Sequence, residues 1–392
     1  MVAFMPANHA VRRINAEVLA ALARAQDAAI SRAFATAQEF CQRICDDLRL
    51  GIPLPDGLRN RPATDIADIS FAELRAFWLG LLNSTGLPES VAVLHAQNLA
   101  QHSQLIRAFD EPEAMLDWAQ EKVTAIVGDF PKTATDIEVG RNPGDVLDPY
   151  ILAGTQTLLF GGSFQPAIGA IVAHKALMIL EGLMGHLHEE VLGRMRGNMK
   201  APEPRGENQE LYDPDLNPFP GADIVQPPLA DDMPLRFHQV KSKTGTLNAS
   251  GGARLAEQMR QLRMRYRGAE IYSHSLVGNT LRGHRSMGTM LRAEPELVVT
   301  VGETAFRILT GSNNGAELLL RLYQNAFRRA ATATGYSIDT MTAAIADAFR
   351  EKAAAAGEGF LELMLHEVTR GVPAAQDSRL YRRRNERGAR QP

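Results

Sequence analysis

Cysteine is scarce in this chain, since Cys41 and Cys45 are the only two cysteines among 392 residues. They are four positions apart on a predicted helix, so their side chains share a face and are able to touch. We interpret them as free thiols in a reducing compartment rather than as a metal-binding or redox pair.

The sequence also lacks a long apolar run and a signal peptide. No stretch approaches the roughly eighteen consecutive apolar residues of a membrane span. The N-terminal residues MVAFMPANHAVRRINAE contain no apolar secretion signal. Hydrophobic residues make up 45% of the chain and charged residues 22%, which suits a globular core. We therefore expect a soluble cytoplasmic protein without a membrane partner, and the length favours two domains.

An overall positive charge is missing too, because the net charge is −3. The segment from Leu235 to Arg292, however, holds eleven Lys or Arg against Glu257 and Glu270, a local charge of +9 that leaves −12 elsewhere. An acidic protein can present a basic cleft to phosphates in this way. The alternative is that residues 260–267 form a solvated basic helix face.

Periodicity divides the chain into a helical part and an α/β part. Residues 1–130 are predicted to form an all-helical accessory domain, with a continuous helical pattern over 11–47 and a capping box at Ser70–Glu73. Residues 131–153, rich in Pro and Gly, are predicted to form a linker. An α/β domain with a mixed four- to five-stranded sheet is expected over 154–372, and a basic flexible tail over 373–392.

The most informative stretch is a predicted strand, Arg236 to Lys243. Alternation places one group of residues on the same strand face: Phe237, Gln239, Lys241 and Lys243. Three polar side chains on one face are costly in a core unless carboxylates, a metal or an anionic ligand accompany them.

Two acids flank this strand in the sequence. Asp223 follows a rigid turn, NPFPGAD, and precedes a short predicted strand, Ile224-Val225. Glu257 lies early on the helix that follows the Lys243 turn. An aspartate, a lysine and a glutamate at these positions can converge on one point, as in magnesium-assisted attack of water on a phosphodiester.

A long helix is predicted over 167–191, before the sheet. Its Glu181 lies among apolar residues and would be costly there without a partner, so we regard it as a further candidate metal ligand. The same helix also carries several possible metal ligands close together: His186, His188, Glu189 and Glu190. Neighbours on a helix point in different directions, however, and this spacing disfavours a zinc site.

A basic loop follows the next predicted strand, 269–277. Its residues 278–288 include Arg282, His284 and Arg285, which suit contacts to phosphate or guanine. Asn248 and Arg254 are the next candidates for DNA contacts. The alternative is a purely structural basic loop. A last strand is predicted over 297–301.

The phrases NPFPGADIV, FHQVKSKTG and GNTLRGHRSMG resemble the PD-(D/E)XK nuclease superfamily, and within it the BsaWI-type restriction endonucleases of the CCGG-cleaving branch. The resemblance covers residues 150 to 370. In that branch the second acid lies on the helix, thirteen residues beyond the lysine, and thirteen residues separate Lys243 from Glu257. The interval between them carries only Arg254, where the better-known CCGG cleavers have an arginine-rich segment.

The resemblance implies that Asp223 and Glu257 bind Mg²⁺ and that Lys243 orients the attacking water. It also leaves a second arrangement open, in which Gln239 replaces the strand acid and Lys241 is the catalytic lysine, as in some superfamily members. The spacing to Glu257 favours Lys243.

The function expected from the resemblance is that of a Type II restriction endonuclease, which hydrolyses double-stranded DNA at a short palindromic site with Mg²⁺. A palindrome demands two-fold symmetry, so a homodimer is expected, with a higher oligomer also compatible. Two alternatives stay open: a structure-specific repair or resolvase-type nuclease of the same superfamily, and a non-catalytic DNA-binding protein.

Overall fold

The structure, a computed structural model, describes residues 14–138, 146–202, 218–229, 233–243, 249–280, 285–334 and 338–369. It forms two compact units, each described by itself below. The first comprises the described parts of Met1–Ala119 and Met184–Ala326, and the second those of Gln120–Leu183 and Phe327–Pro392. These boundaries differ from the predicted division into 1–130 and 154–372, because three long helices run from one unit into the other.

The first unit contains a five-stranded sheet with the order β1-β2-β3-β4-β5. The strands are β1 Met199–Lys200, β2 Ile224–Gln226, β3 Arg236–Lys243, β4 Glu270–Val277 and β5 Val298–Val301. The β1-β2 and β2-β3 pairs are antiparallel, whereas β3-β4 and β4-β5 are parallel. The expected mixed α/β fold is therefore confirmed, and the four predicted strands lie within one residue of their predicted bounds.

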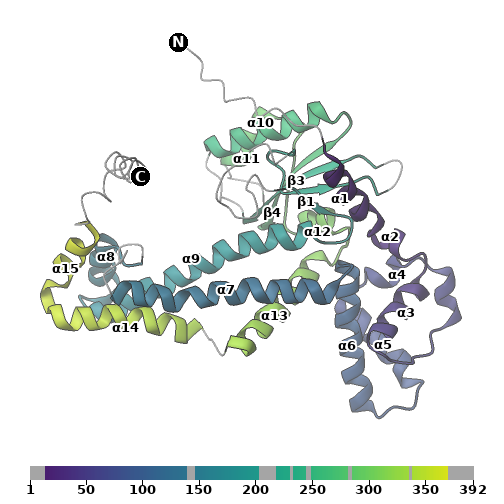
Figure 1. Cartoon of the computed structure of the whole chain (residues 1–392), viewed down its shortest axis with the longest axis horizontal. Helices are drawn as coiled ribbons and strands as arrows, with labels where there is room; N and C mark the ends of the chain where they lie inside the picture. Colours follow the sequence, from purple (N-terminus) through teal and green to yellow (C-terminus); the bar gives the residue numbers. More distant parts are fainter. Residues whose placement is uncertain are drawn as a thin grey trace, which may run out of the picture. The chain divides into compact units, whose positions relative to one another are not determined.

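Helices cover both faces of this sheet (Figure 1). On one face lie α10 Ala249–Arg265 and α11 Arg285–Ala293, together with α1 Ala16–Asp27. Their apolar side chains pack on Phe219 and Phe237, and Tyr266 packs against both of these rings. On the other face lie α12 Glu303–Thr310 and the C-terminal end of α9 Phe164–Gly193.

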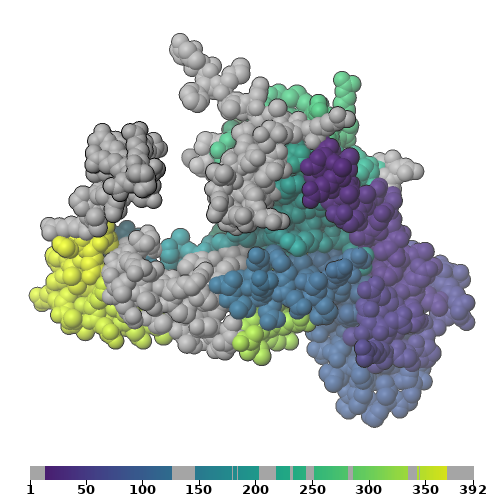
Figure 2. Space-filling view, in the orientation of Figure 1, coloured from purple at the N-terminus to yellow at the C-terminus, as the bar shows by residue number. Residues whose placement is uncertain are grey.

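A separate helical core lies in the N-terminal part of the same unit. It is built from α2 Ile30–Ala33, α3 Ala37–Asp47, α4 Thr64–Ala67, α5 Phe71–Asn83 and α6 Glu89–Ala108, with the short 3-10 helix η1 Asp56–Asn60. Trp78 is fully buried there and its Nε1–H donates to Ser103 at 2.9 Å. The predicted capping box is confirmed, since Ser70 and Glu73 exchange hydrogen bonds at the start of α5. Atoms of α1–α6 form a continuous purple-to-blue surface in Figure 2.

The continuous helix expected over 11–47 is wrong within the described residues. The chain is broken between α1, α2 and α3, and Asn15 and Thr36 cap the first and third of these helices. The cause is tertiary, because Val18 and Ala25 of α1 pack with the sheet whereas Phe40 of α3 packs in the helical core. One straight helix could not reach both cores.

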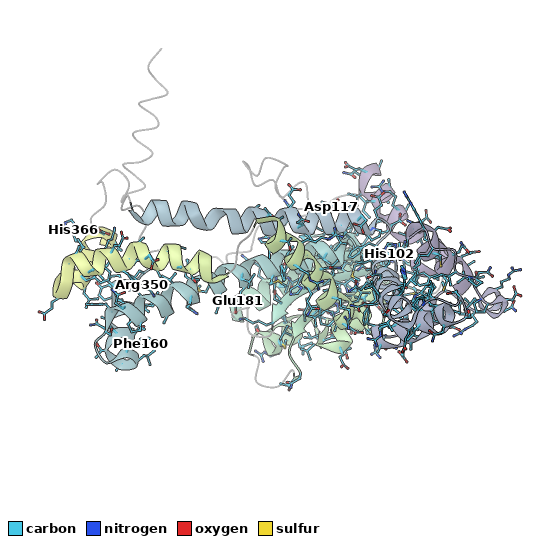
Figure 3. The ribbon with its side chains drawn as sticks, turned by 90° about the horizontal axis from the view of Figure 1, so that it is seen from below. His102, Asp117, Phe160, Glu181, Arg350 and His366 are labelled. Carbon is cyan, nitrogen blue, oxygen red and sulfur yellow. The ribbon has the colours of Figure 1, made fainter. Side chains whose placement is uncertain are left out.

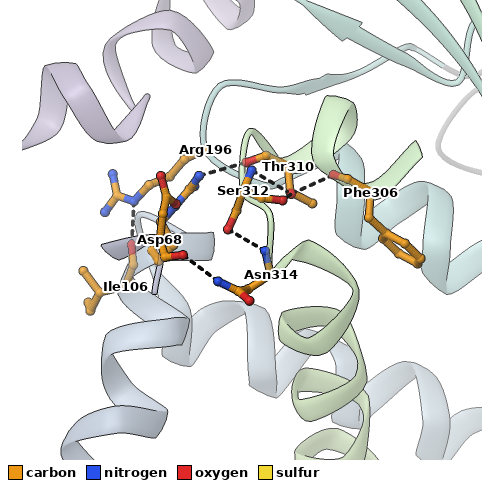
Figure 4. Close-up of polar contacts among 8 residues, drawn as sticks. Asp68, Ile106, Arg196, Phe306, Thr310, Ser312 and Asn314 are labelled. Atoms are coloured by element: carbon orange, nitrogen blue, oxygen red, sulfur yellow. Dashed lines mark hydrogen bonds and ion pairs between the residues drawn. The ribbon is translucent and has the colours of Figure 1, made fainter. Parts of the chain in front are cut away.

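Polar contacts attach the helical core to α12 and to α13 Gly315–Thr334 (Figure 4). The Arg107 guanidinium donates to Asp68 at 2.6 Å and to the Thr310 carbonyl at 3.0 Å, and the Asn314 amide donates to the Asp68 carbonyl. These partners are more than 200 residues apart in sequence, except for the Asp68–Arg107 pair. Local periodicity carries no information about such contacts.

Arg196 begins a segment, 196–215, whose content of Pro, Gly and charged residues is typical of an exposed loop. It is buried at 6% exposure and donates to the carbonyls of Ile106 at 2.7 Å and Ala28 at 2.9 Å. Its guanidinium also pairs with Asp110 at 3.1 Å. Arg196 thus satisfies carbonyls at the ends of two helices, and residues 203–217 lie outside the described residues.

We expect Arg196→Ala to lower the free energy of unfolding by roughly 2–5 kcal/mol, because each buried carbonyl left without a donor costs about 1–3 kcal/mol. The urea midpoint of the purified variant measures this. Arg43→Ala, which removes an exposed pair with Asp47, is the control and should change stability by about 0.5 kcal/mol or less. Equal effects of the two changes would show that Arg196 does not join these helices.

The second unit contains helices that pack around Phe349 and Phe360. They are α8 Pro149–Phe160, the N-terminal part of α9, α14 Ile338–Ala356 and α15 Phe360–Thr369, with the 3-10 helix η4 Gly357–Gly359. The helix α7 Pro112–Glu138 continues through Pro131, and α8 begins at Pro149. The predicted linker 131–153 is therefore helical at both ends, and its residues 139–145 and the predicted tail lie outside the described residues.

One helix, α9, is long and apolar enough to cross a bilayer by length and composition alone. The sequence-based count of consecutive apolar residues overlooked it, because isolated polar residues interrupt the run. A single helix of this kind is weak evidence, since the core helices of soluble proteins have the same composition. The mixed α/β fold around it is compatible with a soluble protein.

Candidate functional site

Asp223 is held rigidly at the entrance of β2. Its backbone N–H donates to the His238 carbonyl at 2.8 Å and its carbonyl accepts from the Ala201 N–H at 2.9 Å. The preceding turn needs glycine at Gly221, where φ is 89° and a Cβ would lie 2.9 Å from Cβ of Gln258. The rigid turn predicted from the sequence therefore fixes Asp223 between β1 and β3.

Consecutive residues of β3 converge on the Asp223 carboxylate. Its Oδ2 atom accepts from the Val240 N–H at 2.7 Å and from the Gln239 side-chain amide at 2.9 Å. The charge of Lys241, the next residue, also acts on this carboxylate. Of the two arrangements left open by the sequence, the structure therefore brings Gln239 and Lys241 to Asp223.

The Asp223 carboxyl has a pKa raised to about 7. Burial among protein atoms is the main cause, and the negative charge of Glu189 adds to it. Lys241, the Val240 hydrogen bond and Lys200 act in the opposite direction without cancelling the shift. The buried Asp223 carboxylate, on which the negative charge of Glu189 acts, therefore favours either a proton or a bound cation.

Glu189 is the site residue that the sequence interpretation missed. It lies near the C-terminal end of α9, only ten positions before β1. A usable signal was present, because so short a connection forces the end of α9 to lie beside the first strand. The neighbouring Glu190 instead forms ion pairs with Lys200 and with Arg194.

Glu181, the acid proposed on this helix, is exposed in the second unit (Figure 3). It lies eight positions before Glu189, which is the acid whose charge acts on Asp223. An acid of α9 therefore acts on the site, but this acid is Glu189 and not Glu181.

Lys243 and Glu257 are the pair that the thirteen-residue spacing favours, and the structure describes their surroundings. Lys243 is exposed at the last position of β3. Glu257 lies on the side of α10 away from its buried Leu255 and Met259, and its carboxylate accepts from Arg260 at 2.8 and 2.9 Å and from Gln261 at 3.2 Å. Hydrogen bonds from Arg260 lower the pKa of Glu257. Among the described residues, the charges acting most strongly on Asp223 belong to Glu189, Lys241 and Lys200.

The predicted DNA contacts are described only in part. Arg254 is exposed on α10, and Arg285 is the first residue of α11. Asn248, Arg282 and His284 lie outside the described residues. The first turns of α10 and α11 are close neighbours, since a Cβ on Gly252 would lie 2.9 Å from the Ser286 carbonyl oxygen. Arg254 and the start of α11 are therefore brought to one region.

Buried histidines support β3 from within the sheet. His238 hydrogen-bonds to His274 at 2.9 Å, and His274 to the Thr300 hydroxyl at 2.6 Å, so the chain of contacts crosses β3, β4 and β5. On α9, His188 hydrogen-bonds to Tyr323 at 2.9 Å. Burial lowers the pKa of His274 to about 3 and that of His188 to about 4, and it also lowers the pKa of His238. All three imidazoles are neutral at physiological pH.

We expect stability to fall as the pH is lowered from about 6.5. The unfolded chain binds protons at these histidines near their ordinary pKa of 6.5, whereas the folded chain resists protonation. Each such histidine lowers the free energy of unfolding by about 1.4 kcal/mol for each pH unit below 6.5. Asp223 has the opposite effect on stability between pH 3.8 and about pH 7, because its pKa is raised in the folded protein. Three histidines outweigh one carboxyl.

Urea midpoints measured between pH 4.5 and 7.5 check this slope. His188→Gln keeps a hydrogen-bonding partner for Tyr323 and should give a shallower dependence than the unchanged protein. A stability that rises on acidification over this range would contradict the assignment of neutral buried histidines.

Comparison with models of known protein families gives no match to this sequence, and no curated protein shows significant similarity to it. The part of the chain that the structure describes contains no group of three or more His, Cys, Asp or Glu arranged to hold a metal ion. The site is therefore judged from its own chemistry: two carboxylates, an amide and two lysines.

Proposed function

We propose that the chain is a Mg²⁺-dependent endonuclease of the PD-(D/E)XK superfamily, acting as a Type II restriction enzyme on double-stranded DNA. The observation that carries the proposal is the convergence of Asp223, Gln239 and Lys241 where β2 meets β3. The mixed sheet, with helices on both faces, is compatible with the core of that superfamily. The resemblance of three sequence segments to that superfamily adds support. The site geometry favours Gln239-Val240-Lys241 as the catalytic segment.

The residues present fit a divalent cation. Asp223 supplies a buried negative charge, and the charge of Glu189 acts on it; burial is the main reason why the pKa of Asp223 is raised. The Oε1 atom of Gln239 is buried and has no hydrogen-bond partner within the described residues, although its amide nitrogen is bonded to Asp223. Hard oxygen donors of this kind suit Mg²⁺, which commonly takes one or two carboxylates and keeps several waters.

When bound, Mg²⁺ would lower the pKa of a bound water and offset charge on the scissile phosphate. Asp223 and Glu189 would hold the cation, together with Oε1 of Gln239. The Gln239 amide and the Val240 N–H fix the Asp223 carboxylate, so that this ligand is preorganised. Lys241 Nζ would donate a hydrogen bond to the attacking water and stabilise the extra negative charge as the P–O bond to the leaving group breaks.

DNA would lie across the basic surface near the starts of α10 and α11. Arg254 is exposed there, and the segment 281–285 with its two arginines leads into α11. Arginine in such a segment suits guanine or phosphate contacts. A short palindrome read by one protein requires two copies related by a two-fold axis, so the active species would be a homodimer in the cytoplasm.

Digestion of phage DNA with the purified protein tests this proposal. Discrete fragments in Mg²⁺, and none in the presence of a chelator, are expected. A smear would indicate cleavage without sequence specificity, as for a structure-specific nuclease of the same superfamily. Binding to DNA without any cleavage would indicate a non-catalytic DNA-binding protein.

A further inference from the structure

The second unit exposes an unusual amount of apolar surface on two of its helices. Six large apolar side chains of α8 and α9 are between 51% and 82% exposed: Tyr150, Ile151, Leu158, Leu159, Leu177 and Met178. So many large exposed apolar side chains on two consecutive helices are unusual for a monomeric protein, in which exposed apolar patches mark interaction sites. Figure 3 labels Phe160, the last residue of α8.

These exposed side chains are not part of the internal core of the second unit. The opposite sides of the same helices already bury a core, in which Leu152 of α8 and Ala167, Ile168 and Val172 of α9 pack around Phe349. Both helices are therefore apolar on two sides. The internal core accounts for one side only.

We propose that this exposed face of α8 and α9 is an interface between two copies of the chain. The inference rests on the homodimer of the proposed function and locates its contact. It does not rest on the chemistry at Asp223, so a dimer that uses this face without cleaving DNA would leave it standing while the nuclease function failed. A stable interface buries about 800 Å² on each partner, and large apolar side chains such as these form the centre of such interfaces.

Charge favours a second copy as the occupant. Residues 149–183 contain Lys175 and Glu181 as their only Lys, Arg, Asp or Glu, although the whole chain is net negative at −3. Two copies can meet at a nearly neutral face without like-charge repulsion. A membrane surface is less suited, because helices that bind lipid headgroups carry several Lys or Arg beside their apolar face.

The order of residues on α9 is itself suited to a two-fold axis. Its exposed stripe includes Ala173, His174, Leu177 and Met178. In an antiparallel pair of these helices, Ala173 would lie opposite the partner's Met178, and His174 opposite the partner's Leu177. The small Ala173 would thus face the larger Met178, which permits close packing, and each contact occurs twice, as an isologous interface requires.

Light scattering after size-exclusion chromatography of the full chain tests the interface. We expect a mass of twice 42.9 kDa for the unchanged protein. Leu177→Glu combined with Met178→Glu should yield monomers and raise the dissociation constant at least about a hundredfold, because each copy would bury two negative charges at the contact. The control is Leu94→Glu, which changes a 58%-exposed leucine of the first unit and should leave the dimer intact.

Far-UV circular dichroism shows whether the double variant is folded, and Leu158→Glu on α8 supplies an independent disruption if it is not. A double variant with Ala173→Cys and Met178→Cys should form a disulfide-linked dimer on oxidation, since the two native cysteines are buried. A monomeric unchanged protein would overturn the proposal, whether or not it binds vesicles of phosphatidylglycerol and phosphatidylcholine. A dimer that survives both sets of glutamate changes would overturn it equally.

Discussion

Lys241→Ala should reduce the Mg²⁺-dependent cleavage of DNA by about a hundredfold to ten-thousandfold. The charge of Lys241 acts on the Asp223 carboxylate, and its neighbours Gln239 and Val240 hydrogen-bond to that carboxylate. Removing the ammonium would leave the attacking water without a donor and the developing phosphate charge without compensation. Single-turnover cleavage rates at saturating protein measure the loss directly.

Lys243→Ala is the matched control for this prediction. Both lysines lie on the same face of β3, about 6.6–6.8 Å apart along the strand, but Lys243 is exposed at its end. Its removal should weaken DNA affinity and reduce the salt dependence of binding. The effect on the rate of DNA cleavage within the bound complex should be much smaller. The reverse ranking would assign catalysis to Lys243 and would restore significance to its thirteen-residue spacing from Glu257.

Asp223→Asn should abolish cleavage and at the same time stabilise the metal-free protein at pH 8. The amide retains an oxygen that can accept from the Val240 N–H, but it carries no charge for a cation. In the unchanged protein the buried carboxyl has a pKa of about 7, compared with 3.8 when unfolded. Folding therefore opposes its ionisation, at about 1.4 kcal/mol for each unit of the difference. Removing the charge should raise the stability by a few kcal/mol.

The pH dependence of this difference provides the control. The cost of the ionised carboxylate develops as the pH rises from about 4 to 7 and is complete above 7, so the two proteins should have similar stability at pH 4 and diverge toward pH 8. Mg²⁺ should raise the melting temperature of the unchanged protein and not that of Asp223→Asn. A variant less stable than the unchanged protein at pH 8 would show that Asp223 is favourably ionised without a cation.

Several features of the fold follow from local sequence patterns. The alternation over 236–243 predicts β3, and the Pro- and Gly-rich turn before Asp223 predicts a fixed aspartate at a strand entrance. Both predictions depend on neighbouring residues alone. They are confirmed in the structure by the register of Ile224 with His238 and by the φ of 89° at Gly221.

The choice among equivalent residues could not be made in this way. Lys241 and Lys243 have the same periodicity, and their difference arises from where Asp223 lies beside β3. Glu181 and Glu189 lie on the same long helix and do not differ in periodicity, so only the short connection from α9 to β1 indicates that the C-terminal end, with Glu189, packs beside the sheet. The pairing of Glu257 with Arg260 and Gln261 likewise depends on which side of α10 faces the core. Tertiary contacts decide each case.

Cleavage of phage DNA by three purified proteins, compared side by side in Mg²⁺, tests the central claim most directly. The unchanged protein should produce discrete fragments, Asp223→Asn should produce none, and Glu257→Gln should still cut, because the site is built from Asp223, Gln239, Lys241 and Glu189. Cleavage by Asp223→Asn at the rate of the unchanged protein, or the absence of cleavage by the unchanged protein itself, would contradict the account.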